Sequence, residues 1–244
     1  MTQGPYEKLR VYVDRHRPFE LRQRAPLLYR ILRNFGAHKI KSVRGRENIP
    51  SGPVVFIANH DGGETPKLVA AVDRPIHIVS AQSTNWQRPL AAFFMRRLGM
   101  IPIQESLSHL SRLEINELNS SNGRFVSGKH YNEVWQRSVK GNAEKIRCMC
   151  SLLVLGRSIA IFPQGLIENV TARADIRRAY AGYALVAREY KKLTGRDIPI
   201  VPVAIHKTTV GFGKPFLIDE FCRNSTFELE ELATNAIGTL FDSL

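Results

Sequence analysis

One histidine stands where a strand is predicted to end. His60 and the preceding Asn59 follow residues 54–58, Val-Val-Phe-Ile-Ala, a continuous apolar run typical of a buried strand. Ligands of open α/β sheets bind at the carboxyl ends of strands, and a neutral imidazole accepts protons near pH 7. Gly62 and Gly63 follow and would let a substrate approach the backbone. A lone histidine is more often structural than catalytic, so His60 is at this point only a candidate for proton transfer.

Two further apolar runs end in residues that suit a site. Residues 159–165, Ile-Ala-Ile-Phe-Pro-Gln-Gly, predict a buried strand followed by a turn. Residues 198–205 predict another strand, in which Pro202 requires either an edge position or a bulge. The other six histidines and the three cysteines lack the paired spacing of metal ligands, so we predict no metal site.

The elements that must position these residues alternate between strand and helix. Strands are predicted at 54–58, 75–80, 101–103, 158–162, 198–205 and 209–217, and helices at 26–35, 65–72, 88–98, 143–155 and 176–193. Thr65 is predicted as the N-cap of its helix, with Pro66 in the first turn. The alternation predicts an α/β fold with a mixed, largely parallel sheet flanked by helices. Residues 105–141 are polar and are interpreted as an insertion or flap.

The N-terminal region is basic. Residues 1–50 contain 12 Lys and Arg against 4 Asp and Glu, whereas the remaining residues contribute only +5 to the net charge of +13. Residues 1–18 are interpreted as a short helix or an arm. In the helix over 26–35, the apolar residues Leu28, Ile31, Leu32 and Phe35 share one face, and Gly36 is predicted as the C-cap. We therefore assign residues 1–40 to membrane contact and residues 41–244 to the α/β domain.

The composition further restricts the class of partner that the protein binds. The chain of 244 residues is 43% apolar and 23% charged, as in globular proteins, and it shows no aromatic platform or motif for nucleic acid. Apolar runs stay below the roughly 20 residues that span a bilayer, and the first residues lack the apolar core of a signal peptide. We expect a peripheral protein at the cytoplasmic face of a membrane, with no nucleic-acid partner.

The order of the motifs resembles one family. Residues 45–60 resemble the opening of the PlsC-like glycerolipid acyltransferases, whose first motif is an Asn-His at a strand end. Residues 98–103, 162–165, 200–204 and 211–215 are similar to the family's later motifs, in the right order over roughly residues 43–218. Phe162-Pro-Gln-Gly165 is the counterpart of the family's Phe-Pro-Glu-Gly.

The resemblance implies an activity. It implies transfer of a fatty acyl group from acyl-CoA or acyl carrier protein to a hydroxyl of a lysophospholipid or related lipid, with His60 as general base and no cofactor beyond the donor. Backbone amides near Gln164 and Gly165, or the two glycines after His60, would stabilise the oxyanion. The substrate-binding residues expected on this basis are Asn59, Gly62, Gly63, Ile103, Gln104, Pro163, Gln164 and Gly165.

Departures from the family's motifs leave alternatives open. The family's first motif is His-x4-Asp, but this chain has Thr65 at the aspartate position. Glu64 is the expected substitute, and Asp61 is the second candidate carboxylate. The arginines that the family uses for the acceptor's phosphate are absent after Ile103 and after Gly165, which leaves Arg173 as a candidate. The alternative function is a catalytically inactive, lipid-binding or scaffolding member of the same fold.

Overall fold

The sheet has seven strands. The computed structural model describes residues 5–16, 26–59, 64–81, 89–103, 143–163, 181–218 and 226–244. The strands are β1 (Ser42–Arg44), β2 (Val55–Ala58), β3 (Ile76–Ala81), β4 (Ile101–Ile103), β5 (Ser158–Ile161), β6 (Ile200–His206) and β7 (Thr209–Phe212). They lie in the order β1-β7-β6-β2-β5-β3-β4. β6, β2, β5, β3 and β4 are parallel, whereas β7 is antiparallel to β6.

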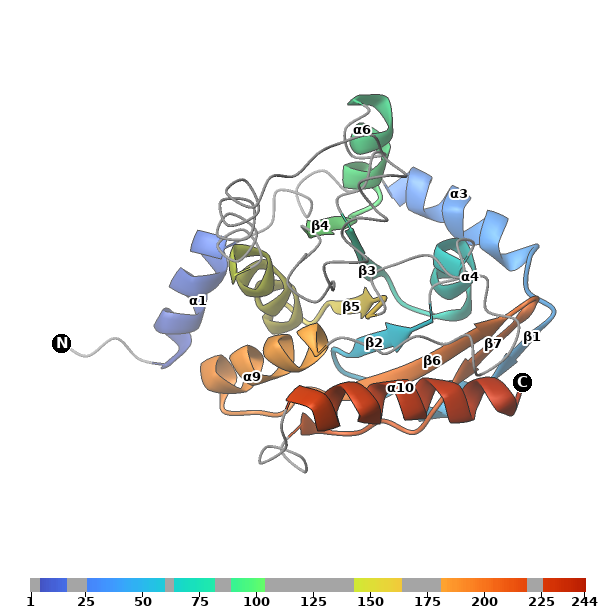
Figure 1. Cartoon of the computed structure of the whole chain (residues 1–244). Coiled ribbons are helices and arrows are strands. Elements are labelled where there is room, and N and C mark those ends of the chain that lie inside the picture. The colour runs from blue at the N-terminus through green and yellow to red at the C-terminus, as the bar shows by residue number, and fades with distance from the viewer. Residues whose placement is uncertain are drawn as a thin grey trace, which may run out of the picture.

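Helices form a layer on each face of this sheet (Figure 1). The helix labelled α4 (Glu64–Ala71) and the helix α3 (Pro26–Ala37) cover one face, with Phe56, Val201 and Leu68 in the core between them and the sheet. The other face is covered by α9 (Gly182–Thr194), α10 (Thr226–Asp242) and the helix over residues 143–154. α6 (Pro89–Arg97) connects parallel strands on the same side as α4, because right-handed crossovers that advance in one direction share a face. The predicted fold class is confirmed.

Most predicted elements lie within two residues of their observed bounds, and two local predictions, for Thr65 and for Gly36, need correction. α4 begins at Glu64, so Thr65 lies inside the first turn and is not the N-cap. β6 is an interior strand, and Pro202 sits at a bulge: the register changes by one residue between the pair Val203↔Phe212 and the pair Ile200↔Phe216. The bulge alternative was therefore the right one for Pro202, because its missing N–H falls where the ladder is already interrupted.

The predicted C-cap Gly36 is the second correction. It lies within α3 and contacts α4: a Cβ placed on it would lie 1.8 Å from the carbonyl oxygen of Pro66. Its φ is not positive, so it is not a left-handed cap. Glycine is required here because the two helix backbones touch. The predicted apolar stripe is divided as a result: Leu32 packs on the core, whereas Ile31 and Phe35 are more than half exposed.

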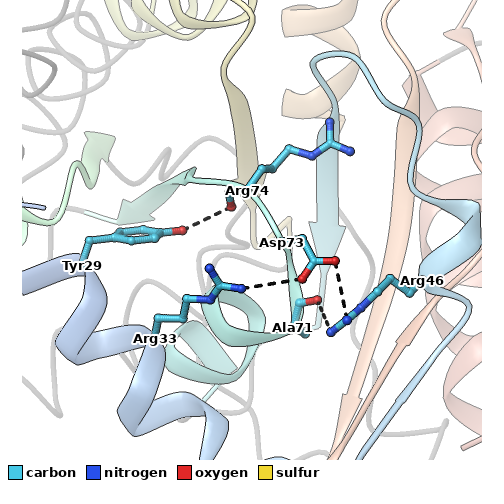
Figure 2. Close-up of polar contacts among 6 residues, drawn as sticks. All are labelled: Tyr29, Arg33, Arg46, Ala71, Asp73 and Arg74. Atoms are coloured by element: carbon cyan, nitrogen blue, oxygen red, sulfur yellow. Dashed lines mark hydrogen bonds and ion pairs between the residues drawn. The ribbon is translucent and has the colours of Figure 1, made fainter.

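Polar contacts attach α3 to the end of α4 (Figure 2). Arg33 of α3 and Arg46 of the short helix η1 (Arg46–Asn48) approach Asp73 from two sides, each at 3.6 Å. The hydroxyl of Tyr29 accepts a hydrogen bond from the Ile76 N–H at 3.1 Å. Because the ion pairs are largely exposed, each contributes about 0–1 kcal/mol, so the Gly36 contact and Tyr29 contribute most of the attachment.

The N-terminal helix α1 (Pro5–His16) packs elsewhere. Val13 is buried, and Tyr12 packs against the core on the α9 side of the sheet. Burial raises the pKa of Tyr12 above its ordinary value, and the charge of Glu189 on α9 adds to this effect. In Figure 1, α1 and α3 accordingly lie at opposite ends of the molecule. The two helices of residues 1–40 therefore pack on different parts of the α/β domain.

We predict that alkaline pH destabilises the protein through Cys150. Its thiol is fully buried in the helix over 143–154, and burial raises its pKa from 9.0 to about 12. The unfolded thiol ionises near pH 9 while the folded thiol stays protonated, so the free energy of unfolding falls as pH rises between these values. The slope for one group is at most about 1.4 kcal/mol per pH unit.

Urea unfolding of the wild type and of Cys150→Ala at several pH values between about 8 and 10.5 tests this linkage. The wild type should lose stability more steeply with pH than Cys150→Ala does, because only the wild type gains protons on folding at this site. Parallel slopes for the two proteins would contradict the prediction.

Candidate functional site

The parallel strands bring the predicted site residues to one edge of the sheet. Asn59 follows β2 and Pro163 follows shortly after β5, and the register Ile57↔Ile161 sets these two residues level with each other. β4 ends at the same edge but lies three strands from β2, which corresponds to roughly 14 Å. Ile103 is therefore remote from the β2 end, whereas Pro163 is adjacent to it.

The side chain of Asn59 fixes the end of β2. Its Nδ2 donates a hydrogen bond to the Ile205 carbonyl at 2.9 Å, and its Oδ1 accepts one from the Ile205 N–H at 2.7 Å. The side chain is fully buried, so the amide continues the β2–β6 ladder by one step beyond the strand. This geometry favours a positioning role for the residue before His60 over the substrate contact that the sequence suggested.

Asn59→Ala should lower both stability and acyl transfer. Removal of the amide leaves two buried backbone groups of Ile205 without partners, at a cost of about 1–3 kcal/mol each. Asn48 provides a matched control, because its Nδ2 donates a single bond of 2.9 Å to the Phe212 carbonyl of β7 and does not hold the end of β2. Chemical unfolding should show about 1 kcal/mol lost for Asn48→Ala with activity unchanged. Equal losses in both variants, without an activity difference, would remove the positioning role.

Glu64 lies in the first turn of α4, the helix that follows β2 along the chain. The side chain is only 2% exposed, whereas the following Thr65 is half-buried. The two ends of the segment from His60 to Glu64 are separated by four peptide units and hence by at most about 14 Å. A carboxylate at a helix N-terminus is favoured by the backbone dipole. The helix therefore directs Glu64, and not the residue at the family's aspartate position, into the protein.

The remaining predicted site residues divide into two groups. Pro163 is buried, and Ile103 packs against the core on the α9 side of the sheet. Eight others lie outside the described residues, so their predicted roles stay predictions: His60, Asp61, Gly62, Gly63, Gln104, Gln164, Gly165 and Arg173. Sequence reasoning missed the backbone of Ile205 as the partner of Asn59, because no local signal joins residues 146 positions apart.

Two kinds of feature are absent from the described part of the chain, a membrane-spanning helix and a cluster of metal ligands. None of the helices there is long and apolar enough to cross a membrane. In those same residues, no group of three or more His, Cys, Asp or Glu side chains is placed to hold a metal ion.

Comparison with known proteins agrees with this geometry. No curated protein sequence matches the chain. A solved structure that is similar to it is that of the 1-acyl-sn-glycerophosphate (LPA) acyltransferase PlsC from Thermotoga maritima, with a TM-score of 0.55 and 14% sequence identity over 88% of this chain and 79% of that one. At this identity the likeness shows the fold. The family model for Acyltransferase matches residues 41–206, from the start of β1 to the end of β6, and so contains the whole parallel part of the sheet. The chain therefore belongs to the acyltransferase family.

Proposed function

We propose that the protein transfers a fatty acyl group from a thioester, acyl-CoA or acyl carrier protein, to a hydroxyl of a lysophospholipid or related lipid. The observation that carries the proposal is the buried carboxylate of Glu64, four residues after His60 in a chain of the acyltransferase family. A buried carboxylate at this point supports a catalytic role for the preceding histidine, since it would orient the imidazole and stabilise its protonated form.

The proposed reaction proceeds by direct attack. The His60 imidazole accepts the proton of the acceptor hydroxyl while its oxygen attacks the thioester carbonyl carbon. Backbone N–H groups near Gly165, or those of the glycines after His60, stabilise the oxyanion. The intermediate then collapses: the C–S bond breaks, the thiolate takes the proton from the imidazolium, and the ester and a free thiol are released. The chain needs no cofactor for these steps.

Exposed apolar side chains on α3 support contact with a membrane. Leu27, Ile31 and Phe35 lie at i, i+4 and i+8 and are each more than half exposed. The ammonium group of Lys39 lies 4.3 Å from the centre of the Phe35 ring, and α3 contains no acidic residue. A face of this kind enters the headgroup layer of an anionic bilayer. The protein would thus act as a peripheral enzyme at the cytoplasmic face, where the thioester donors are.

The class of acceptor is inferred from arginines that are missing from two of the motifs. The phosphate-binding arginines of the family are missing after Ile103 and Gly165, so we propose a lipid acceptor that is not held through a terminal phosphate, unless Arg173 replaces them. The neighbour from Thermotoga maritima is named as an acyltransferase of 1-acyl-sn-glycerophosphate (LPA), and the acceptor proposed for this chain is a different one.

Incubation with radiolabelled acyl-CoA and, separately, acyl carrier protein tests the function. Total lipid extract and a panel of lysophospholipids serve as acceptors, and the products are separated by chromatography. A labelled lipid formed by the wild type would identify the donor and the acceptor class together. If the protein binds lipid vesicles but transfers no label from either donor, the inactive lipid-binding alternative is favoured, and the Thr65 and Gln164 departures explain it.

A further inference from the structure

The helix α6 has an exposed apolar face. Leu90 is 70% exposed, Phe93 48% and Phe94 43%, while Ala92 on the opposite side of the helix is buried. The rings of the two phenylalanines contact each other edge to face, with their centres 5.7 Å apart. Three large apolar side chains within five positions form a contiguous patch, which is unusual for a surface that meets only water.

Positive charge borders this patch. Arg96 and Arg97 lie in the last turn of α6, and the first turn contains no acidic residue. The guanidinium of Arg97 lies 5.1 Å from the centre of the Phe93 ring, four positions earlier. Lys39 and Phe35 show the same arrangement at the end of α3, also four positions apart. α3 and α6, which come from separate parts of the chain, thus each have an exposed aromatic ring with a cation one helical turn after it.

The two helices also lie in one layer. α3 packs along α4, and α6 connects β3 to β4 on the face of the sheet that α4 covers. Figure 1 shows α3, α4 and α6 on the same side, away from α9 and α10. α6 follows β3, whose carboxyl end belongs to the edge at which β2 ends before His60. α6 and α3 thus belong to the helix layer on the same face of the sheet.

We infer that α6 is a second membrane-docking element, which inserts Leu90, Phe93 and Phe94 into an anionic lipid surface beside α3. Rings and leucine enter the boundary between headgroups and acyl chains, and Arg96 and Arg97 meet the lipid phosphates. The choice of a lipid surface as occupant rests on the proposed function and on the positive charge of both helices. Contacts through both α3 and α6 would hold the sheet edge at which β2 ends at a fixed distance from the bilayer, from which a lipid acceptor enters.

Co-sedimentation with vesicles tests the inference. The vesicles contain phosphatidylcholine with or without phosphatidylglycerol, and the triple variant Leu90→Gln/Phe93→Gln/Phe94→Gln is compared with the wild type. Leu155→Gln/Leu185→Gln is the matched control, because both leucines are similarly exposed but lie on the opposite layer. We expect the α6 variant to bind phosphatidylglycerol vesicles at least about tenfold more weakly, with the control unchanged.

A second probe does not depend on several simultaneous substitutions. Vesicles that contain brominated lipid should quench the tryptophan fluorescence of Leu90→Trp but not that of Leu185→Trp. Both signals are compared with the background fluorescence of the two native tryptophans. Transfer to a short-chain, monomeric acceptor separates the inference from the proposed function, since the α6 variant should retain it. Wild-type-like vesicle binding by the α6 variant would overturn the inference and leave that activity intact. Loss of binding to acyl carrier protein, with vesicle binding kept, would overturn it in favour of a protein partner.

Discussion

Replacement of His60 with alanine should lower kcat/KM for acyl transfer at least about 10²-fold, because a positioned general base contributes roughly 10²–10⁴-fold. The hydroxyl of an acceptor lipid is a poor nucleophile until its proton is removed, and the proposed mechanism has no other base at that point. His38→Ala is the control, since that histidine is exposed just after α3 and is not among the predicted site residues. Initial rates with the labelled donor measure both variants.

Loss of the Glu64 carboxylate should also lower acyl transfer, but by less than loss of the His60 imidazole does. Glu64→Gln keeps the size of the buried side chain and removes its charge, so transfer should fall at least about tenfold with little change in thermal stability. Adding Thr65→Asp to this variant restores the family's His-x4-Asp spacing but should recover little of the activity, because α4 directs Glu64 and not residue 65 into the protein. Unchanged turnover in His60→Ala would end the assignment of the base, whatever Glu64 does.

The strands of the core could be predicted because their information is local. Residues 54–58 are apolar at every position, which is expected only of a strand covered on both faces, and β2 indeed lies in the interior of the sheet. The alternation of strands and helices along the chain then predicted the mixed, largely parallel fold. Both inferences needed only residue types and short spacings.

What the sequence did not reveal depends on contacts between distant residues. The hydrogen bonds between Asn59 and Ile205 exist because β6 pairs with β2, and no residue pattern within either strand predicts that pairing. α10 is a different case: it was not predicted, although Leu229, Ala233 and Ile237 give a local signal, being buried against the sheet at helical spacing. The sequence also did not show that the phenylalanines of α6 are exposed, because apolar residues of a helix follow the same spacing whether they contact protein or lipid.

Gly36 shows how one position can be misread from sequence and still be testable. A glycine after an amphipathic helix normally ends it in the left-handed conformation, but here it lets α3 approach α4. Any side chain at this position meets backbone, because its Cβ would lie 1.8 Å from the Pro66 oxygen and 2.4 Å from the Pro66 carbonyl carbon. Backbone cannot rotate aside as a side chain does, so the two helices must separate.

We therefore expect Gly36→Ala to lower the free energy of unfolding by about 3 kcal/mol or more, at the upper end of overpacking costs. Gly182→Ala is the matched control, since nothing lies within 4 Å of its added Cβ and the helix α9 should gain slightly. Urea unfolding compares the two. Because Pro66 lies two residues after Glu64, displacement of α4 should also lower acyl transfer in the folded fraction of Gly36→Ala. Equal stability of the two variants would mean that α3 is not seated on α4 in solution, and the exposed faces assigned to membrane contact would then need reassignment.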